Sequence, residues 1–157
     1  MFEFIQSISI DVEEKKSRGD AYISDNIPLF QDHFPGAPIL PGTFLVELTA
    51  QVAGLLAEEV AKHQFGIEKW ALLGMIRQAK LLEPVPATLT IMSDLKRLEL
   101  SNALLTVQAS QNECKKLQGE VVMMMIDASP AWDAAINARN HRLKCWSNEY
   151  KMAANTN

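Results

Sequence analysis

The apolar residues of the chain recur with two different spacings, and these predict its secondary structure. Between residues 4 and 13 apolar and polar side chains largely alternate, the polar segment Lys15–Gly19 follows, and Ala21–Ile23 is apolar again. This pattern predicts a strand, a turn and a second strand. Later apolar runs separated by polar or proline-containing breaks predict further strands. These runs are Ala71–Leu82, Ala87–Leu100, Leu104–Ser110 and Leu117–Ile126.

A segment between the second and third predicted strands has the spacing of a helix. Neither proline nor another turn signal occurs from Thr43 until Gly66, and apolar residues recur every three or four positions. We predict a helix from about Pro41 to His63 that is apolar almost all the way round and is therefore enclosed by the rest of the protein. One such helix with about six antiparallel strands predicts an α+β fold in which the sheet wraps around the helix.

The length of 157 residues favours one domain. We expect residues 1–128 to form this domain. Residues 129–157 have more basic than acidic side chains and end in a run of Ala, Asn and Thr. We expect them to form a C-terminal extension with a short helix near Trp132–Trp146 and a frayed end.

Composition and charge exclude several classes of protein. The formal charge is −4, from 15 Lys and Arg against 19 Asp and Glu, which argues against nucleic acid or an anionic membrane as the main partner. No apolar run is long enough to span a membrane, and we see no secretory signal. Cys114 and Cys145 stand far apart with no metal-ligand spacing around them. We therefore expect a cytoplasmic protein with reduced thiols and no metal site.

Two ionisable residues are candidates for proton-transfer chemistry. His33 lies in a loop crowded with proline and glycine, and an imidazole is largely neutral near pH 7 and can serve as a base. Glu47 lies on the predicted helix among apolar residues, where an enclosed carboxyl loses hydration and its protonated form becomes available as an acid. Gln51 is one turn further and could orient that carboxyl. Pro41 and Gly42 would begin the helix, whose first N–H groups can bind an oxyanion that develops at a carbonyl.

Each of these residues also has a purely structural interpretation. A single buried Glu is more often satisfied by backbone or water than catalytic, and a lone His beside Phe34 is often part of the packing. Pro41 and Gly42 could simply form a tight turn into a helix. Taken one at a time, the residues favour these structural interpretations.

Read as one string, His33-Phe34-Pro35-Gly36-Ala37-Pro38, then Pro41-Gly42 and Glu47-Leu48-Thr49-Ala50-Gln51, resembles the signature of the 3-hydroxyacyl-[acyl-carrier-protein] dehydratases. The family signature is His-Phe-Pro-Gly-x-Pro, Pro-Gly and a Glu-x-x-Ala-Gln helix, with the spacing seen here. A weaker resemblance extends over about Ser24 to Met125. The resemblance implies the hot dog fold, a long helix wrapped by an antiparallel sheet.

The resemblance also implies a role for each matching residue. His33 would take the C2 proton of a 3-hydroxyacyl thioester, and Glu47 would protonate the departing C3 hydroxyl. Gly42 would polarise the thioester carbonyl, and Gln51 would hold Glu47. With Phe34 and Pro41, Gly42 and Gln51 are the predicted substrate-binding residues.

Partners follow from the same resemblance. The substrate would be tethered to an acyl carrier protein, an acidic partner that a basic patch would help to dock. The candidates for that patch are Arg77, Lys80, Lys96 and Arg97. The His and Glu of one family site come from two subunits, so we expect a homodimer or a higher assembly such as a trimer of dimers. The chemistry is proton transfer, and we expect no cofactor.

The chain departs from the family pattern at several places. Pro86-Ala87-Thr88 replaces the usual Pro-Gly-Asp turn, an N-terminal Pro-His-Arg segment is not found, and the residues after Ser129 have no counterpart that we can place. These differences leave the acyl length and pathway open, so polyene, polyketide or lipid synthesis is as plausible as housekeeping fatty-acid synthesis.

Three other readings of the function stay open. One is a hot dog thioesterase that uses a helix carboxylate, although such enzymes usually lack the His-Phe-Pro-Gly loop. A second is a bifunctional dehydratase and isomerase, although that branch has Asp at the position of Glu47. The third is a non-catalytic hot dog subunit that binds acyl chains, against which the intact His33 and Glu47 argue.

Overall fold

The computed structural model describes residues 4–24, 27, 30, 33, 36, 39–84, 88–129, 131, 134, 137–138, 141 and 144–145. They form one long helix and six strands. The strands are β1 (Ile5–Asp11), β2 (Lys16–Tyr22), β3 (Lys69–Leu81), β4 (Thr88–Leu98), β5 (Asn102–Gln111) and β6 (Cys114–Asp127), and the helix is α2 (Gly42–Phe65).

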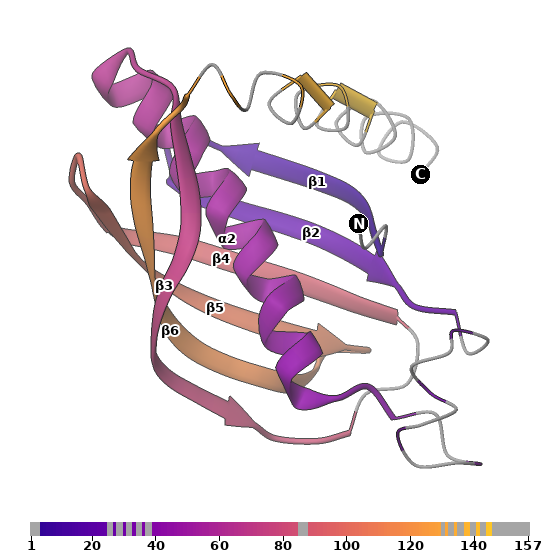
Figure 1. The fold of residues 1–157 in the computed structure, drawn as a ribbon. Helices are drawn as coiled ribbons and strands as arrows, with labels where there is room; N and C mark the ends of the chain where they lie inside the picture. The colour runs from indigo at the N-terminus through magenta and orange to yellow at the C-terminus, as the bar shows by residue number, and fades with distance from the viewer. Residues whose placement is uncertain are drawn as a thin grey trace.

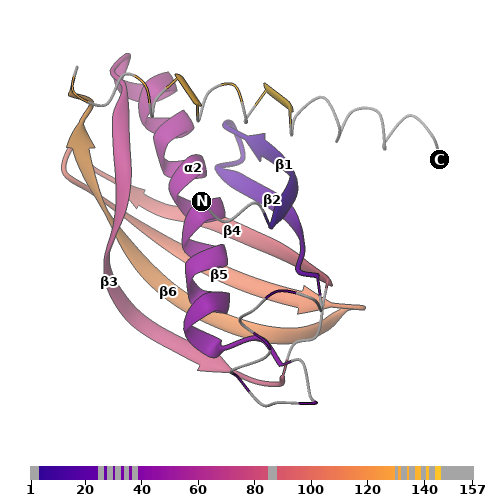
Figure 2. The same cartoon turned by 45° about the vertical axis from the view of Figure 1, so that its right-hand side comes forward.

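The strands form a single sheet in the order β1-β2-β4-β5-β6-β3, and each neighbouring pair is antiparallel. The sheet curves around α2, which lies across its concave side (Figures 1 and 2). The core is therefore the space between the helix and the inward-facing side chains of the strands, such as Leu48, Leu56, Ile91, Leu105 and Val121. This arrangement confirms the predicted α+β layout.

The helix begins and ends close to the predicted positions. Pro41 precedes it with φ −56°, and Gly66 ends it in the left-handed conformation with φ 69°, donating its N–H to the Lys62 carbonyl. Glycine takes this conformation without steric cost, so it is a common residue just past a helix. Twelve of the 24 residues of α2 are buried, so the protein encloses about half of the helix and less of it than predicted.

One predicted boundary is wrong. The polar segment Lys15–Gly19 was expected to form a turn, but β2 already begins at Lys16 and the turn covers residues 12–15. The reason is that Ser17 and Gly19 face inward although neither is apolar and large. A Cβ at Gly19 would lie 2.8 Å from Val52 Cγ2 of the helix, so small residues are needed where β2 passes closest to α2.

The C-terminal extension lies largely outside the described residues. Those that are described between residues 134 and 145 are helical, and the short helix from Trp132 to Trp146 stays a prediction. Both Trp132 and Trp146, its predicted ends, fall outside them. No helix in the described part of the chain combines the length and the apolar character needed to cross a membrane.

Candidate active site

Glu47 lies on the one face of α2 that the sheet leaves open. Its side chain is exposed, as is that of Thr43 one turn earlier, whereas Leu48, Thr49 and Ala50 are buried. The prediction that the Glu47 carboxyl is enclosed is therefore wrong for one isolated copy of the chain. The fully enclosed carboxylate of α2 is Glu58 instead, at 6% exposure.

Gln51 holds the Glu47 carboxylate in place. Its Nε2 donates to Glu47 Oε1 over 3.0 Å, across one helical turn. The amide occupies one carboxylate oxygen and leaves the second, Oε2, for a substrate group. The predicted contact between Gln51 and Glu47 is therefore present in the structure.

His33 is half-buried in the loop before α2, and its ring is oriented by the backbone. Nδ1 lies 3.1 Å from the carbonyl oxygen of Ile39. Because a carbonyl can only accept, Nδ1 carries a proton, and in the neutral ring the lone pair is then on Nε2. This is the tautomer that a general base requires. Within the described part of the chain, His33 and Glu47 share no hydrogen bond or ion pair with each other.

The start of α2 supplies free backbone donors. Pro41 makes no side-chain cap, and its carbonyl accepts from the N–H groups of Phe44 and Leu45. Gly42 N–H has no acceptor among the described residues, so it is available to an oxyanion. A Cβ at Gly42 would collide with Leu81 Cδ1, so the missing side chain here lets β3 approach the helix start. Phe34, the remaining predicted substrate-binding residue, lies outside the described residues.

A cavity of about 230 Å³ opens beside Gly42. Its walls are mostly leucine side chains from the loop, the helix and the end of β3, with one carboxylate at the rim. The lining residues are Leu40, Gly42, Leu45, Leu81, Leu82, Glu83 and Pro84. An apolar pocket next to a free backbone donor suits a molecule that joins a hydrocarbon part to a carbonyl.

Strand β3 contacts the helix near both of its ends, and its middle part is exposed. At one end, Glu58 Oε1 accepts the backbone N–H of Ala71 over 2.8 Å. At the other end, Leu81 packs against Gly42. Between these anchors Ile76 and Ala79 pair with the inward-facing Val121 and Gly119 of β6, yet both are exposed.

The predicted docking residues do not form one basic patch. Arg77 and Lys80 lie on β3, whereas Lys96 and Arg97 lie on β4, with β5 and β6 between them. Three of the four are paired with acids, through Arg77–Glu120 at 3.2 Å, Lys96–Asp94 at 2.6 Å and Arg97–Glu99 at 3.5 Å. Lys80 has no ion pair among the described residues.

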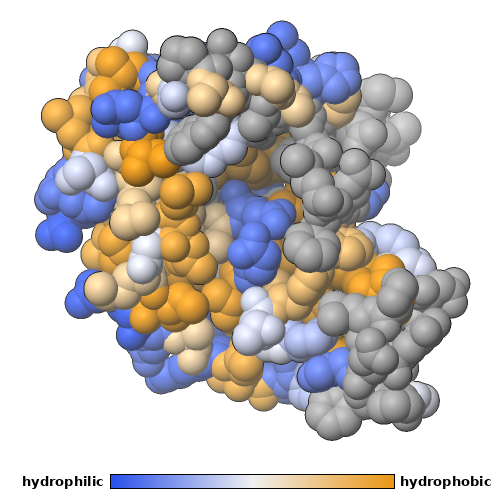
Figure 3. All heavy atoms as spheres, in the orientation of Figure 1, coloured by the Kyte–Doolittle hydropathy of each residue, from blue (hydrophilic) through white to orange (hydrophobic). Residues whose placement is uncertain are grey.

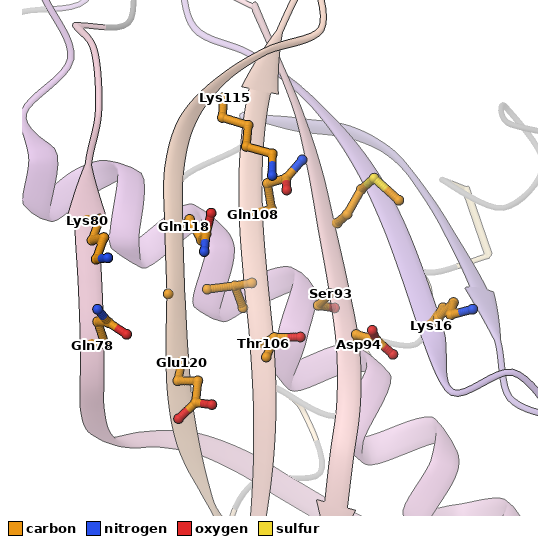
Figure 4. A pocket seen from close by; sticks show the side chains of 13 residues that line it. Lys16, Gln78, Lys80, Ser93, Asp94, Thr106, Gln108, Lys115, Gln118 and Glu120 are labelled. Carbon is orange, nitrogen blue, oxygen red and sulfur yellow. The ribbon is translucent and has the colours of Figure 1, made fainter.

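Lys80 borders a polar groove of about 430 Å³ on the side of the sheet opposite α2 (Figure 4). The groove runs across strands β4, β5, β6 and β3 and is lined by amides and by charges of both signs. Its labelled residues include Gln78, Gln108 and Gln118, with Lys115 at one end (Figure 4). The sheet separates this groove from Glu47, so the groove is distinct from the candidate active site.

Sequence reasoning missed three residues that hold β3 and the segment after it in place. Leu81 was assigned to a strand but not to the start of the helix, Glu58 was not singled out, and Lys116 was placed in a break between strands. Lys116 is instead buried in β6 and pairs with Glu83. Only the Glu58 position carried a signal, because it lies eleven residues after Glu47 on the same side of the helix.

The fold defines a hot dog protein, whose candidate residues His33 and Glu47 lie in the loop before the central helix and in the first turns of that helix. Solved structures with the same fold include a conserved protein from Pseudomonas aeruginosa, with a TM-score of 0.61 and 9% identity over 78% of this chain and 88% of that one. A second is a putative thioesterase from Lactococcus lactis, with a TM-score of 0.58 and 17% identity over 78% of this chain and 91% of that one. At these identities the likeness concerns the fold alone.

A family model described as ApeI dehydratase matches residues 9–117, well over half of the chain. The chain belongs to the ApeI-like dehydratase family, which confirms the class of enzyme predicted from its signature. It is 28% identical to the 3-hydroxyacyl-[acyl-carrier-protein] dehydratase FabZ of Chlamydia trachomatis over 121 residues, 76% of this chain and 78% of that one. It is 37% identical to the enzyme of the same name from Caldanaerobacter subterraneus over 76 residues, 48% of this chain and 54% of that one.

Proposed function

We propose that this dehydratase removes water from a 3-hydroxyacyl thioester on an acyl carrier protein and leaves the trans-2-enoyl thioester. The proposal is supported by the accessibility of one candidate side chain, Glu47, and by the tautomer of the other, His33. Glu47 is open to a substrate and held by Gln51, and the His33 ring has its proton on Nδ1. The FabZ relatives, named as dehydratases of this substrate, support the same reaction in fatty-acid synthesis or a related lipid, polyene or polyketide pathway.

Each step of this dehydration is assigned to a group of the protein. His33 Nε2 takes the C2 proton, and the electron pair of that C–H bond moves toward the thioester carbonyl, whose oxygen is stabilised by Gly42 N–H. The pair then forms the C2–C3 double bond as Glu47, in its protonated form, gives its proton to the departing hydroxyl. Water leaves, and His33 and Glu47 return to their starting states by passing one proton back.

The test is a direct assay. A purified sample is mixed with a 3-hydroxyacyl carrier-protein thioester, and enoyl product and free thiol are followed together. We expect enoyl product without free thiol from the wild type, and a loss of about 10²–10⁴-fold in both His33→Ala and Glu47→Gln. Free thiol as the main product would identify a thioesterase, and neither product at any acyl length would identify a binding subunit. Either result would overturn the proposal.

We also propose that the active form is a homodimer built on β3. This strand is thirteen residues long, forms one edge of the sheet and has exposed apolar side chains, including Met75 at 59% and Ile76 at 46%. Apolar residues gather over β3 on the face drawn in Figure 3. A long apolar edge invites pairing with another chain, and a partner there would cover Glu47 and exclude water from it.

Mixing two inactive variants tests whether one site uses residues of both chains. In a 1:1 mixture of His33→Ala and Glu47→Gln, half of the dimers are mixed, and each mixed dimer has one site with both intact groups. We therefore expect about a quarter of the wild-type activity after subunit exchange. If His33 and Glu47 of one chain formed a site, the mixture would stay inactive.

Carrier-protein docking is part of the same proposal. Among the predicted residues Lys80 is the strongest candidate, because it borders the polar groove on the outer side of the sheet and is free of the ion pairs that hold Arg77, Lys96 and Arg97. We expect Lys80→Glu to raise KM for the carrier-bound substrate and to leave KM for a small thioester unchanged. A cytoplasmic location fits a substrate that is passed between carrier-dependent enzymes.

A further inference from the structure

A β-bulge in β6 turns Lys116 toward the inside of the molecule. In the pairing of β5 with β6, Ala109 faces Leu117 and Ser110 faces Lys115, so Lys116 is the extra residue with no partner. Two successive residues, Lys116 and Leu117, are consequently both buried, whereas neighbours in a regular strand point to opposite faces. Bulges are common next to active sites, where they redirect a side chain.

The redirected ammonium group binds the segment that follows β3. Lys116 Nζ lies 2.5 Å from Glu83 Oε2, with 11% of the lysine side chain and 57% of the glutamate side chain exposed. The Lys116 carbonyl also accepts the N–H of Leu82 over 2.8 Å. Two contacts from one residue therefore fix Leu82 and Glu83 in position.

Those two residues are part of the wall of the cavity beside Gly42. The rest of that wall is mostly leucine, which suits the hydrocarbon part of an acyl thioester. The carrier's pantetheine arm has amide groups that need hydrogen-bond partners, so an apolar pocket suits it poorly. With the thioester carbonyl at Gly42, the acyl chain is the part of the substrate that would enter this cavity.

We infer that the Lys116–Glu83 ion pair sets the acyl length that this dehydratase accepts, by fixing Leu82 and Glu83 in the wall of its cavity. The inference rests on the proposed function. An acyl chain too long for the cavity presses on that wall, and moving Leu82 and Glu83 breaks an ion pair whose lysine is buried. Lys116 is thus a positioning residue, and Glu83 is the group that meets the chain.

The experiment measures kcat/KM for 3-hydroxyacyl thioesters of increasing length in the wild type and in Lys116→Met. We expect a cutoff in the wild type and a cutoff at least two carbons longer in the variant. Because each additional buried methylene contributes about fourfold, the long-to-short ratio should rise by about tenfold or more. Lys115→Met, on the neighbouring exposed residue of β6, is the matched control and should keep the wild-type profile.

A second variant guards against a failure of Lys116→Met to fold. Glu83→Gln changes a side chain that is mostly exposed, keeps its size and weakens only the ion pair, so it should shift the profile in the same direction by a smaller amount. A merely structural pair would lower kcat/KM equally at all lengths, and this uniform loss would overturn the inference. The absence of enoyl product from the wild type would overturn the proposed function instead, so the two failures are distinguishable.

Discussion

Two glutamates on one side of α2 show how position changes the role of the same side chain. Glu47 and Glu58 are eleven residues apart, which is about three helical turns, so they lie on nearly the same stripe of the helix. Glu47 is exposed and is held by another side chain, Gln51. Glu58 is buried and accepts a backbone N–H from β3.

Strand β3 accounts for the difference. Near Glu58 this strand lies close to the helix. A Cβ placed on Gly54 of the helix would come within 3.6 Å of Ala71 Cβ and 3.2 Å of Met123 Cε. Near Glu47 the inward residues of β3 are exposed, so the strand does not cover the helix there. One carboxylate is therefore used to hold the fold together, and the other remains accessible to a substrate.

The largest expected effect is the loss of activity in Glu47→Gln, which distinguishes a catalytic role of this residue from a structural one. Glu47→Gln removes the proposed acid but keeps size and exposure, so kcat/KM should fall by about 10²–10⁴-fold. Because no buried contact is lost, the urea midpoint should stay within error of the wild type. A large loss of stability in this variant would show that the exposed face of α2 is structural after all.

Glu58→Ala should show the opposite behaviour. The change leaves the Ala71 N–H without its acceptor in a partly buried place, which costs about 1–3 kcal/mol of unfolding free energy. Urea denaturation measures this loss, and Glu58→Gln should recover part of it by keeping an oxygen acceptor. The neighbouring Glu59→Ala is the control and should stay near the wild type. Equal losses in Glu58→Ala and Glu59→Ala would contradict a specific contact with β3.

Gln51→Ala should have a smaller effect on activity than the loss of Glu47. It removes the hydrogen bond that orients the Glu47 carboxyl, which is neutral in its proposed acid form, and such a bond is worth about 0.5–1.5 kcal/mol, so kcat/KM should fall by roughly twofold to tenfold. The fall should appear mainly in kcat, measured with saturating substrate. Gln64→Ala, at an exposed position of the same helix, is the matched control and should change neither kcat nor KM.

The smallest effect is expected at the far end of the helix. Lys62 Nζ donates to Glu68 Oε1 over 3.0 Å, and this hydrogen bond and the charge of Glu68 raise the pKa of Lys62. Both side chains are largely exposed, so Lys62→Met should cost less than about 1 kcal/mol at pH 7.

The contribution of the Lys62–Glu68 pair to the free energy of unfolding should decrease at high pH. Because the pKa of Lys62 is raised in the folded state, its stabilisation is complete below about pH 10.4, the ordinary lysine value, and disappears as pH rises through the folded-state pKa. Unfolding curves of the wild type and Lys62→Met should therefore converge above that range. A difference that grows with pH would contradict the ion pair as its origin.

Much of the fold follows from local patterns in the sequence. The helix and most strand boundaries agree with the predictions, because apolar spacing and proline or glycine breaks act over a few residues. The start of β2 was not predicted. Small residues, Ser17 and Gly19, face inward there because space near Val52 is limited, and this requirement comes from a distant part of the chain. The bulge at Lys116 was not predicted for a similar reason, since it depends on the pairing of β6 with β5.

The sequence by itself determined the signature residues, their spacing and the class of dehydratase, because those are properties of a contiguous string. Only the tertiary structure decided which carboxylate of the helix is accessible and which is buried. It also brought Leu81, Glu83 and Lys116 to the start of α2 from distant parts of the chain. The physical reason is that burial and charge pairing depend on the path of β3 across the helix, which the spacing of residues along the helix does not specify.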